Sequence, residues 1–272
     1  MGYLTTDKKK ITAKTLLEMK AAGEKITQMT AYDFTTAGII DAAGIDSILV
    51  GDSASNVMAG NQDTTPITVD QMIYHARAVV RACHHCLVVC DMPFGSYQVS
   101  REDGIRNAIR IIKETGAGAV KMEGGKEIAD TVKGIVDAGI PVIGHLGLTP
   151  QSIHKFGGYG LRAKEDTEAE KLIEDALALD AAGVSGITLE KVPAVLANKV
   201  TAMVKAATIG IGAGNGTDGQ VLVYADALGM TSEFKPKFLR HFANVNKCMT
   251  EGVMEYIRCV KSESFPSEAE SY

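Results

Sequence analysis

The sequence has little of what marks a secreted or membrane-spanning protein. Five cysteines in 272 residues are too few and too unevenly spaced for a disulfide framework, so we expect free thiols in a reducing compartment. No stretch of about 18 uncharged apolar residues occurs, and no apolar signal-peptide core follows Lys8, Lys9 and Lys10. These absences predict a cytoplasmic protein that does not associate with a membrane.

The composition also lacks an excess of basic residues. The formal net charge is −5 and the isoelectric point is near 5.7. Nothing in this balance draws the chain to nucleic acid or to an anionic membrane surface. The apolar content of 46% is enough to fill a sizeable core, and small molecules are the expected partners.

Eight short apolar runs alternate with helical patterns along the chain. Each is apolar almost throughout, as expected of a parallel strand that is covered on both faces. The alternation predicts an α/β fold, a single (β/α)8 TIM barrel, although an open doubly wound sheet gives a similar pattern. The expected strands are Lys25 to Asp33, Ser47 to Ser53, Cys86 to Pro93, Gly118 to Gly124, Pro141 to Gly147, Gly186 to Val192, Ala207 to Gly214 and Gln220 to Met230.

The domain organisation expected from this pattern is simple. One catalytic barrel with a short N-terminal helical extension occupies residues 1–260, and the pattern from about Pro236 to Val260 is helical again. Residues 261–272 are rich in Ser and Glu and are expected to form a mobile tail.

Carboxylates end several of the apolar runs. The C-terminal ends of all strands in a barrel meet at one face, where active sites are built. Any one of these carboxylates has the alternative of capping a helix or pairing with a lysine, but five together predict a site. They are Asp33, Asp52, Asp91, Glu123 and Glu190.

Three of these carboxylates follow successive strands and predict a metal site. Asp52, Asp91 and Glu123 offer oxygen ligands to one hard cation, for which Mg²⁺ is the natural candidate. Without an ion, carboxylates packed around one point repel each other strongly. The alternative is a hydrogen-bonded structural cluster.

Other ionisable residues are expected beside this site. Lys121 shares a strand face with Glu123, where a cation suits an anionic substrate such as a small 2-oxo acid; an ordinary ion pair is the alternative. Glu190 is the candidate general base, or else a salt-bridge partner of Lys191. His145 is a possible hydrogen-bond donor or proton relay, or a structural histidine.

Two local patterns point elsewhere. Cys83, His84, His85 and Cys86 resemble half of a zinc site, but the chain contains no second half. We therefore favour buried thiols that act as small hydrophobes for Cys86 and the nearby Cys90.

The second pattern is a glycine series, Gly210, Gly212, Gly214 and Gly216. No long helix opens after it and no acidic residue marks a ribose site, so dinucleotide binding is not predicted. A phosphorylated ligand and a plain close approach of the backbone both remain open.

Seven motifs together resemble the ketopantoate hydroxymethyltransferase family. They occur between Thr27 and Phe242, and GlyHisLeuGlyLeuThrProGln at 144–151 is the most specific. The others are ValGlyAspSer, AspMetProPhe, ValLysMetGluGlyGly, PheGlyGlyTyr, LeuGluLysValPro and GlyIleGlyAlaGly.

The resemblance implies a barrel of the phosphoenolpyruvate/pyruvate type, a cytoplasmic homodecamer, Mg²⁺ and the cosubstrate 5,10-methylenetetrahydrofolate. The implied reaction is hydroxymethyl transfer to 3-methyl-2-oxobutanoate, which gives 2-dehydropantoate in the first committed step of pantothenate biosynthesis. It further implies the roles of individual residues. The implied metal site is Asp52, Asp91 and Glu123, the implied oxo-acid site is Asp52, Ser53, Asp91 and Lys121, and the implied proton acceptor is Glu190.

Two other functions compete with this one. A folate-independent, magnesium-dependent lyase or aldolase of 2-oxo acids uses the same kind of barrel. A binding protein that kept only the scaffold is disfavoured, because all the carboxylates named above are present.

Overall fold

The structure, a computed structural model, describes residues 10–231 and 235–272. The chain divides into two compact units, one that ends at Leu222 and one from Val223 to Tyr272. Residues 1–9 of the expected N-terminal extension lie outside the described residues.

Eight parallel strands form a closed barrel in the order of the sequence, which confirms the predicted fold class. Each expected apolar run overlaps one strand, and β8 closes the barrel by pairing with β1. The strands are β1 (Ile26–Thr30), β2 (Ser47–Val50), β3 (Leu87–Asp91), β4 (Ala119–Glu123), β5 (Val142–Gly147), β6 (Gly186–Glu190), β7 (Ala207–Ile211) and β8 (Gly219–Leu222).

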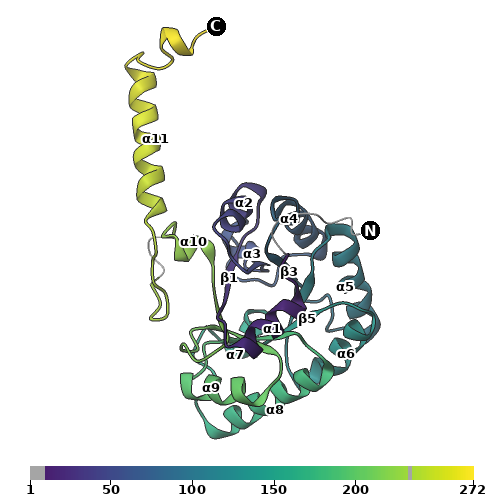
Figure 1. Ribbon diagram of the computed structural model, residues 1–272. Coiled ribbons are helices and arrows are strands. Elements are labelled where there is room, and N and C mark those ends of the chain that lie inside the picture. The colour runs from purple at the N-terminus through teal and green to yellow at the C-terminus, as the bar shows by residue number, and fades with distance from the viewer. Residues whose placement is uncertain (1–9, 232–234) are drawn as a thin grey trace. The chain divides into compact units, whose positions relative to one another are not determined.

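Six helices lie around the outside of the barrel (Figure 1), and their N-termini show why they begin where they do. Thr68 and Ser100 cap two of them by accepting the backbone N–H of Gln71 and Asp103. The helices are α2 (Phe34–Ala42), α4 (Val69–Ala82), α5 (Arg101–Thr115), α6 (Ala129–Asp137), α8 (Asp166–Ala182) and α9 (Ala194–Met203). Short helical turns follow three strands: α3 (Ala54–Val57), η1 (Lys126–Ile128), η2 (Pro150–Ser152) and α7 (Ile153–Phe156).

The last strand connection corrects the expectation of a helix after every strand. Residues 212–218 join β7 directly to β8 without a helix, whereas parallel strands usually need a crossover of a dozen or more residues. Gly212 and Gly214 adopt φ values of 62° and 79°, and a Cβ on Gly216 would lie 1.7 Å from Asn198 Oδ1. The glycine series therefore serves a tight loop and a close backbone approach.

The expected eighth strand, Gln220 to Met230, is too long. The strand ends at Leu222, and Tyr224–Ala227 forms the short helix α10, in which the amides of Ala227 and Leu228 donate to Val223 and Tyr224. The apolar residues of this segment are buried on a helical turn, and a short apolar run does not distinguish a strand from a helix.

Helix α1 (Ala13–Ala22) closes the amino end of the barrel. Leu16 and Met19 belong to a buried cluster that includes the first residues of several strands, among them Ile26, Leu87 and Ala207. Thr12 caps this helix in a reciprocal capping box with Thr15. The barrel is thus filled from its amino end, which leaves its carboxyl end for polar side chains.

The second unit contains α10, the 17-residue helix α11 (Val245–Lys261) and the short η3 (Glu268–Glu270). The expected helical region from Pro236 begins too early, because the Asn244 side chain caps α11 by accepting the Lys247 amide. None of the residues of α11 is buried. Among the described helices, none is long and apolar enough to span a membrane.

Two glycines with similar backbone conformation test how tightly β5 and β6 approach each other. Gly147 has φ 91° and Gly139 has φ 87°, so alanine costs about 1–2 kcal/mol of conformational strain at either position. A Cβ on Gly147 would also lie 2.3 Å from the Glu190 carbonyl oxygen, whereas one on Gly139 meets no atom within 4 Å. We expect Gly147→Ala to lower the unfolding free energy in urea by about 2 kcal/mol more than Gly139→Ala does. Equal losses of unfolding free energy in the two variants would show that β5 and β6 move apart to accommodate the added methyl group.

Candidate active site

The carboxyl ends of neighbouring strands position the candidate site. Asp91, Glu123 and Glu190 are the last residues of β3, β4 and β6, and Asp52 follows β2 by two residues. Lys121 and His145 lie on β4 and β5, between Asp91 and Glu190 in the strand order. The barrel therefore brings to one end residues that are far apart in the sequence.

Three of these carboxylates are almost completely buried. Asp52, Asp91 and Glu123 expose 4%, 2% and 6% of their surface. Burial raises the pKa of Asp52 well above its usual value, and the neighbouring Asp91 and Glu123 raise it further. The mouth of the barrel therefore concentrates negative charge that favours a bound cation.

Lys121 forms an ion pair with Asp91, not with Glu123. Lys121 Nζ lies 2.9 Å from Asp91 Oδ1, and the two residues are aligned in neighbouring strands. Adjacent strands lie about 4.8 Å apart, whereas Lys121 and Glu123, two positions apart in one strand, are separated by about 6.6 Å. Burial lowers the pKa of Lys121, but the charges of Asp91 and Glu123 outweigh it and hold the amine protonated.

His145 lies between the metal-site candidate Glu123 and the candidate base Glu190. Its Nδ1 is 3.3 Å from Glu123 Oε1 and its Nε2 is 3.4 Å from Glu190 Oε2. Burial and Lys121 both lower the pKa of His145, but the hydrogen bonds with Glu123 and Glu190 outweigh them and raise the pKa to about 9. Glu190 therefore faces a histidine, while Lys191 Nζ donates to the Tyr159 carbonyl group instead.

Ser53 and Asp33, which the sequence also named as candidates, have different roles in the structure. The Ser53 hydroxyl shares a hydrogen bond of 2.8 Å with the Tyr32 hydroxyl beside Asp52. Asp33, by contrast, accepts the Thr36 amide at 2.9 Å and caps α2. The expectation that Asp33 joins the site carboxylates is thus replaced by its alternative, helix capping.

Gln151 is a central residue of the site to which sequence reasoning assigned no role. Its side-chain amide donates to Asp52 Oδ2 at 2.8 Å, and its backbone N–H donates to Glu123 Oε2 at 2.9 Å. Tyr97 donates in turn to Gln151 Oε1 at 2.7 Å. The one available signal was the position of Gln151 at the end of the motif that follows β5.

The buried carboxylates suit a hard divalent cation. Apart from the ion pairs with Lys121 and His145, Asp91 Oδ1 and Glu123 Oε1 have no partner among the described residues. Asp52, Asp91 and Glu123 do not bring three oxygens within 4.8 Å of one another. Mg²⁺ tolerates such spacing, because it is bound through one or two carboxylates and keeps several waters.

A cavity of about 540 Å³ adjoins the carboxylates. Glu123 and Gln151 line it together with the aromatic rings of Phe94 and Phe156. The Arg162 guanidinium stacks 4.0 Å from the centre of the Phe156 ring. The cavity therefore offers aromatic and cationic surfaces next to the charged centre.

Comparison with known proteins decides the family. A family model for ketopantoate hydroxymethyltransferase matches residues 10–268. The chain belongs to this family. The 3-methyl-2-oxobutanoate hydroxymethyltransferase of Flavobacterium johnsoniae is 60% identical over 272 residues, which cover 100% of both chains. The protein of the same name from Bacteroides fragilis is 57% identical over 100% of this chain and 99% of its own. The resemblance read from the motifs is confirmed.

Solved structures of distant proteins share the fold of this hydroxymethyltransferase family member. Phosphonopyruvate hydrolase, in a complex with oxalate and Mg²⁺, has a TM-score of 0.61 at 12% identity and covers 96% of this chain and 93% of its own. A 2,3-dimethylmalate lyase of the PEP mutase/isocitrate lyase superfamily has a TM-score of 0.59 at 15% identity, with coverage of 96% and 91%. At these identities the likeness concerns the barrel alone.

Gln151→Glu tests whether a neutral donor between Asp52 and Glu123 is needed for metal binding. The new carboxylate faces Asp52 in a buried setting, where like charges repel strongly. We expect loss of hydroxymethyltransferase activity by about 100-fold and weaker Mn²⁺ binding in the presence of a competing chelator. Gln71→Glu is the matched control, because Glu preserves the capping box of α4. Unchanged Mn²⁺ affinity in Gln151→Glu would contradict this role.

Proposed function

We propose that this chain transfers a hydroxymethyl group from 5,10-methylenetetrahydrofolate to 3-methyl-2-oxobutanoate, which gives 2-dehydropantoate in the first committed step of pantothenate biosynthesis. Family membership along nearly the whole chain is the observation that carries the proposal. The site adds chemical support, because it combines buried carboxylates, a protonated lysine and a less buried carboxylate that is free to take a proton.

The proposed metal-site residues are Asp52, Asp91 and Glu123, of which one or two would bind Mg²⁺ directly and the rest through its waters. A bound Mg²⁺ supplies positive charge beside the keto oxygen of the substrate, where negative charge develops during the reaction. Gln151 keeps Asp52 and Glu123 in place through neutral N–H donors that add no charge of their own. This arrangement leaves the carboxylates free to balance the cation.

Glu190 is the proposed general base. Its side chain is 18% exposed, unlike that of His145, which is 4% exposed. Glu190 therefore reaches the mouth of the barrel, where it removes the proton from C3 of the oxo acid. His145 orients the carboxylate from behind and, with a raised pKa, offsets its charge.

The carbon–carbon bond forms between C3 of the deprotonated oxo acid and the methylene carbon of the folate. Both carbon–nitrogen bonds of that methylene group break, and one water molecule supplies the hydroxyl group of the product. The second proton of the water and the proton taken from C3 go to the two nitrogens of the tetrahydrofolate that leaves. Lys121 and Ser53 are proposed to hold the substrate carboxylate, while the metal-site residues Asp52 and Asp91 would contact the oxo acid through the bound cation. A lysine has three N–H donors, and Asp91 occupies one of those of Lys121, which leaves donors for the substrate.

Glu190→Gln tests the base separately from substrate binding. The substitution retains the size of the side chain, but an amide cannot accept the proton, so we expect product formation to fall about 1000-fold while the oxo acid and Mg²⁺ still bind. The measurements are mass-spectrometric detection of 2-dehydropantoate and NMR detection of C3 proton exchange in the oxo acid. Glu18→Gln, on α1 at the other end of the barrel, is the matched control. Normal exchange in Glu190→Gln would assign the proton to another group.

A lyase or aldolase remains the second candidate, since a 2,3-dimethylmalate lyase shares the barrel. Such an enzyme needs no folate. If C3 exchange proceeds but no product forms with 5,10-methylenetetrahydrofolate, this second function replaces the first.

The cavity beside Glu123 is the proposed folate site. Phe94, which is 50% exposed, lines it and offers a ring face for the flat pterin. We expect Phe94→Ala to raise the KM for the folate about tenfold and to leave the KM for the oxo acid nearly unchanged. Tyr74→Ala is the matched control, because Tyr74 is also exposed but lies on α4 away from the cavity lining. An equal effect on both substrates would place the folate elsewhere.

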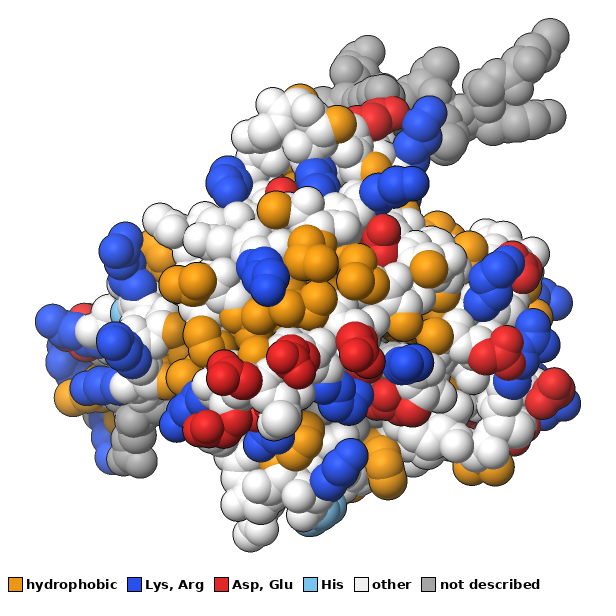
Figure 2. All heavy atoms as spheres, turned by 90° about the horizontal axis from the view of Figure 1, so that it is seen from below, with side chains coloured by type: hydrophobic (Ala, Val, Ile, Leu, Met, Phe, Trp, Pro, Cys, Tyr) orange, Lys and Arg blue, Asp and Glu red, His pale blue; other side chains and the backbone are white. Residues whose placement is uncertain are grey.

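We also propose that the enzyme is the cytoplasmic homodecamer that the resemblance implies. Helix α11 exposes a set of apolar side chains, which indicates an interface with another chain. Figure 2 shows a cluster of apolar side chains bordered by charges of both signs. The exposed set on α11 is Met249, Val253, Met254, Tyr256, Ile257 and Val260. Light scattering after size-exclusion chromatography is expected to give the mass of ten chains, and a monomer would contradict the proposal.

A further inference from the structure

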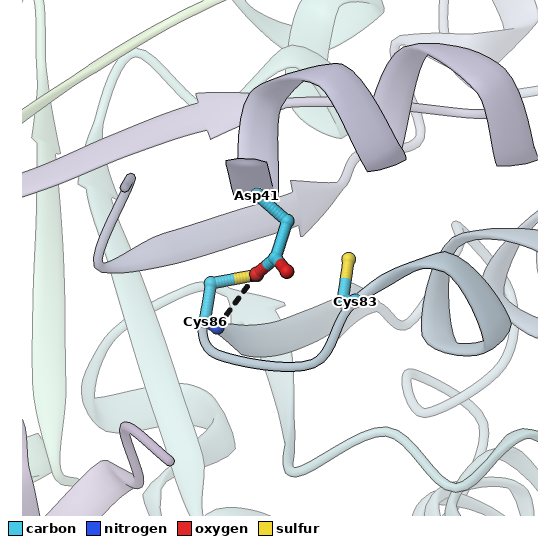
Figure 3. A group of neighbouring side chains, drawn as sticks. All are labelled: Asp41, Cys83 and Cys86. Atoms are coloured by element: carbon cyan, nitrogen blue, oxygen red, sulfur yellow. Dashed lines mark hydrogen bonds between the residues drawn. The ribbon is translucent and has the colours of Figure 1, made fainter. Parts of the chain in front are cut away.

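A second cluster of metal-ligating side chains lies at the opposite end of the barrel from the carboxylates (Figure 3). Cys83 directly follows α4, Cys86 directly precedes β3, and Asp41 is in the last turn of α2. One carboxylate oxygen and the two sulfur atoms all lie within 4.8 Å of one another. Five residues of extended chain, about 16 Å, separate Cys86 from Asp91 at the other end of β3.

Backbone amides hold the Asp41 carboxylate beside the thiols. Asp41 Oδ2 accepts the His84 amide at 2.9 Å and Oδ1 accepts the Cys86 amide at 2.9 Å, while the His85 amide donates to Oδ1 at 3.2 Å. Burial alone would raise the pKa of Asp41, but these bonds outweigh it and lower the pKa. The carboxylate is therefore charged, and the Cys86 thiol donates to the acceptor position that the three amides leave. A cation would take that position when it displaces the thiol proton.

The two thiols are placed for coordination and not for redox chemistry. Cys83 and Cys86 are 5% and 0% exposed. The hydrogen bond with Cys83, followed by burial, raises the pKa of the Cys86 thiol far above its usual value. A buried thiol with a raised pKa is a poor nucleophile, so disulfide exchange is disfavoured. Coordination instead follows from the placement of the two sulfur atoms and the Asp41 oxygen within 4.8 Å of one another, where one thiophilic ion can displace the thiol protons.

We propose that Cys83, Cys86 and Asp41 bind one thiophilic divalent ion of the Zn²⁺ type, independently of the Mg²⁺ centre. Binding forms two metal–sulfur bonds and one metal–oxygen bond, and the two thiol protons pass to water without any change of oxidation state. His85 does not bring a ring nitrogen within 4.8 Å of all three of these ligand atoms, so a water molecule would be the fourth ligand. Thiolate ligands select this ion over Mg²⁺.

A bound ion would link α2, α4 and β3 at the amino end of the barrel. It joins the end of α2 to the α4–β3 loop, to which the backbone of the N-terminal segment also bonds through Ile11 and His85. Sequence reasoning favoured buried, unliganded thiols here. That expectation concerned Cys86 and Cys90, and the structure confirms that both are buried and free. It also places the buried Cys83 beside Cys86 and adds Asp41, which lies more than forty residues away in the sequence.

Cadmium titration of the reduced, full-length protein tests the proposal. The protein is first stripped with a chelator and then given excess Mg²⁺, which fills the carboxylate centre. The readout is the ultraviolet thiolate-to-cadmium charge-transfer absorption, to which carboxylate ligands do not contribute. We expect this absorption to saturate at one equivalent of Cd²⁺, and Zn²⁺ to reverse it.

Substitutions assign the signal to this cluster. Cys83→Ser and Cys86→Ser are expected to lose most of the absorption, and Asp41→Asn to raise the Cd²⁺ concentration needed for saturation while its amide oxygen still accepts backbone bonds. Cys248→Ser and Cys259→Ser, in the second unit, are the matched controls and retain the signal. Circular dichroism establishes that each variant is folded, and Cys83→Ala replaces Cys83→Ser if the latter is not.

Two results would overturn the proposal, and neither depends on hydroxymethyltransferase activity. One is a wild-type protein with intact thiols that shows no charge-transfer absorption at one equivalent of Cd²⁺. The other is an absorption that persists when both Cys83 and Cys86 are replaced in a folded protein, which would place the ion on other thiols.

Discussion

The ion pair between Lys121 and Asp91 is the interaction on which the mouth of this barrel depends. Three buried carboxylates, those of Asp52, Asp91 and Glu123, meet in a space that excludes most water, where like charges repel strongly. One buried amine offsets part of that repulsion, and the amide of Gln151 contributes donors without charge. The negative charge that remains matches a divalent cation, so the requirement of the fold and the requirement of the chemistry coincide.

The two ends of the barrel carry different tasks. At the carboxyl end, strand termini and short turns present ionisable side chains around a cavity, as is general for enzymes of this architecture. At the amino end, α1 seals the interior with Leu16 and Met19, and Asp41 organises the loop before β3. Rigid packing at the amino end supports the accurate placement of charged groups at the other, because the same strands connect both.

Much of this fold could be predicted from the apolar runs, because eight of them alternate with helical patterns, which is typical of parallel strands buried on both faces. The prediction was wrong where an apolar stretch continues beyond the end of a strand. After Leu222 the chain forms α10, in which Tyr224, Ala225 and Ala227 remain buried. The glycines between β7 and β8 predicted an unusual backbone conformation. The physical reason, the close approach of the Asn198 side chain to Gly216, is visible only in the structure.

The sequence by itself determined which residues reach the carboxyl end of the barrel, because strand length and alternation decide where each charged residue falls. Tertiary structure decided their partners. Lys121 pairs with Asp91 because the register of β3 and β4 aligns them, His145 bridges Glu123 and Glu190 because β5 lies between β4 and β6, and Asp33 caps a helix instead. Asp41 likewise meets Cys83 and Cys86 because the fold brings separate segments of the chain together. Contacts between segments depend on register and helix packing, which no local pattern of residues contains.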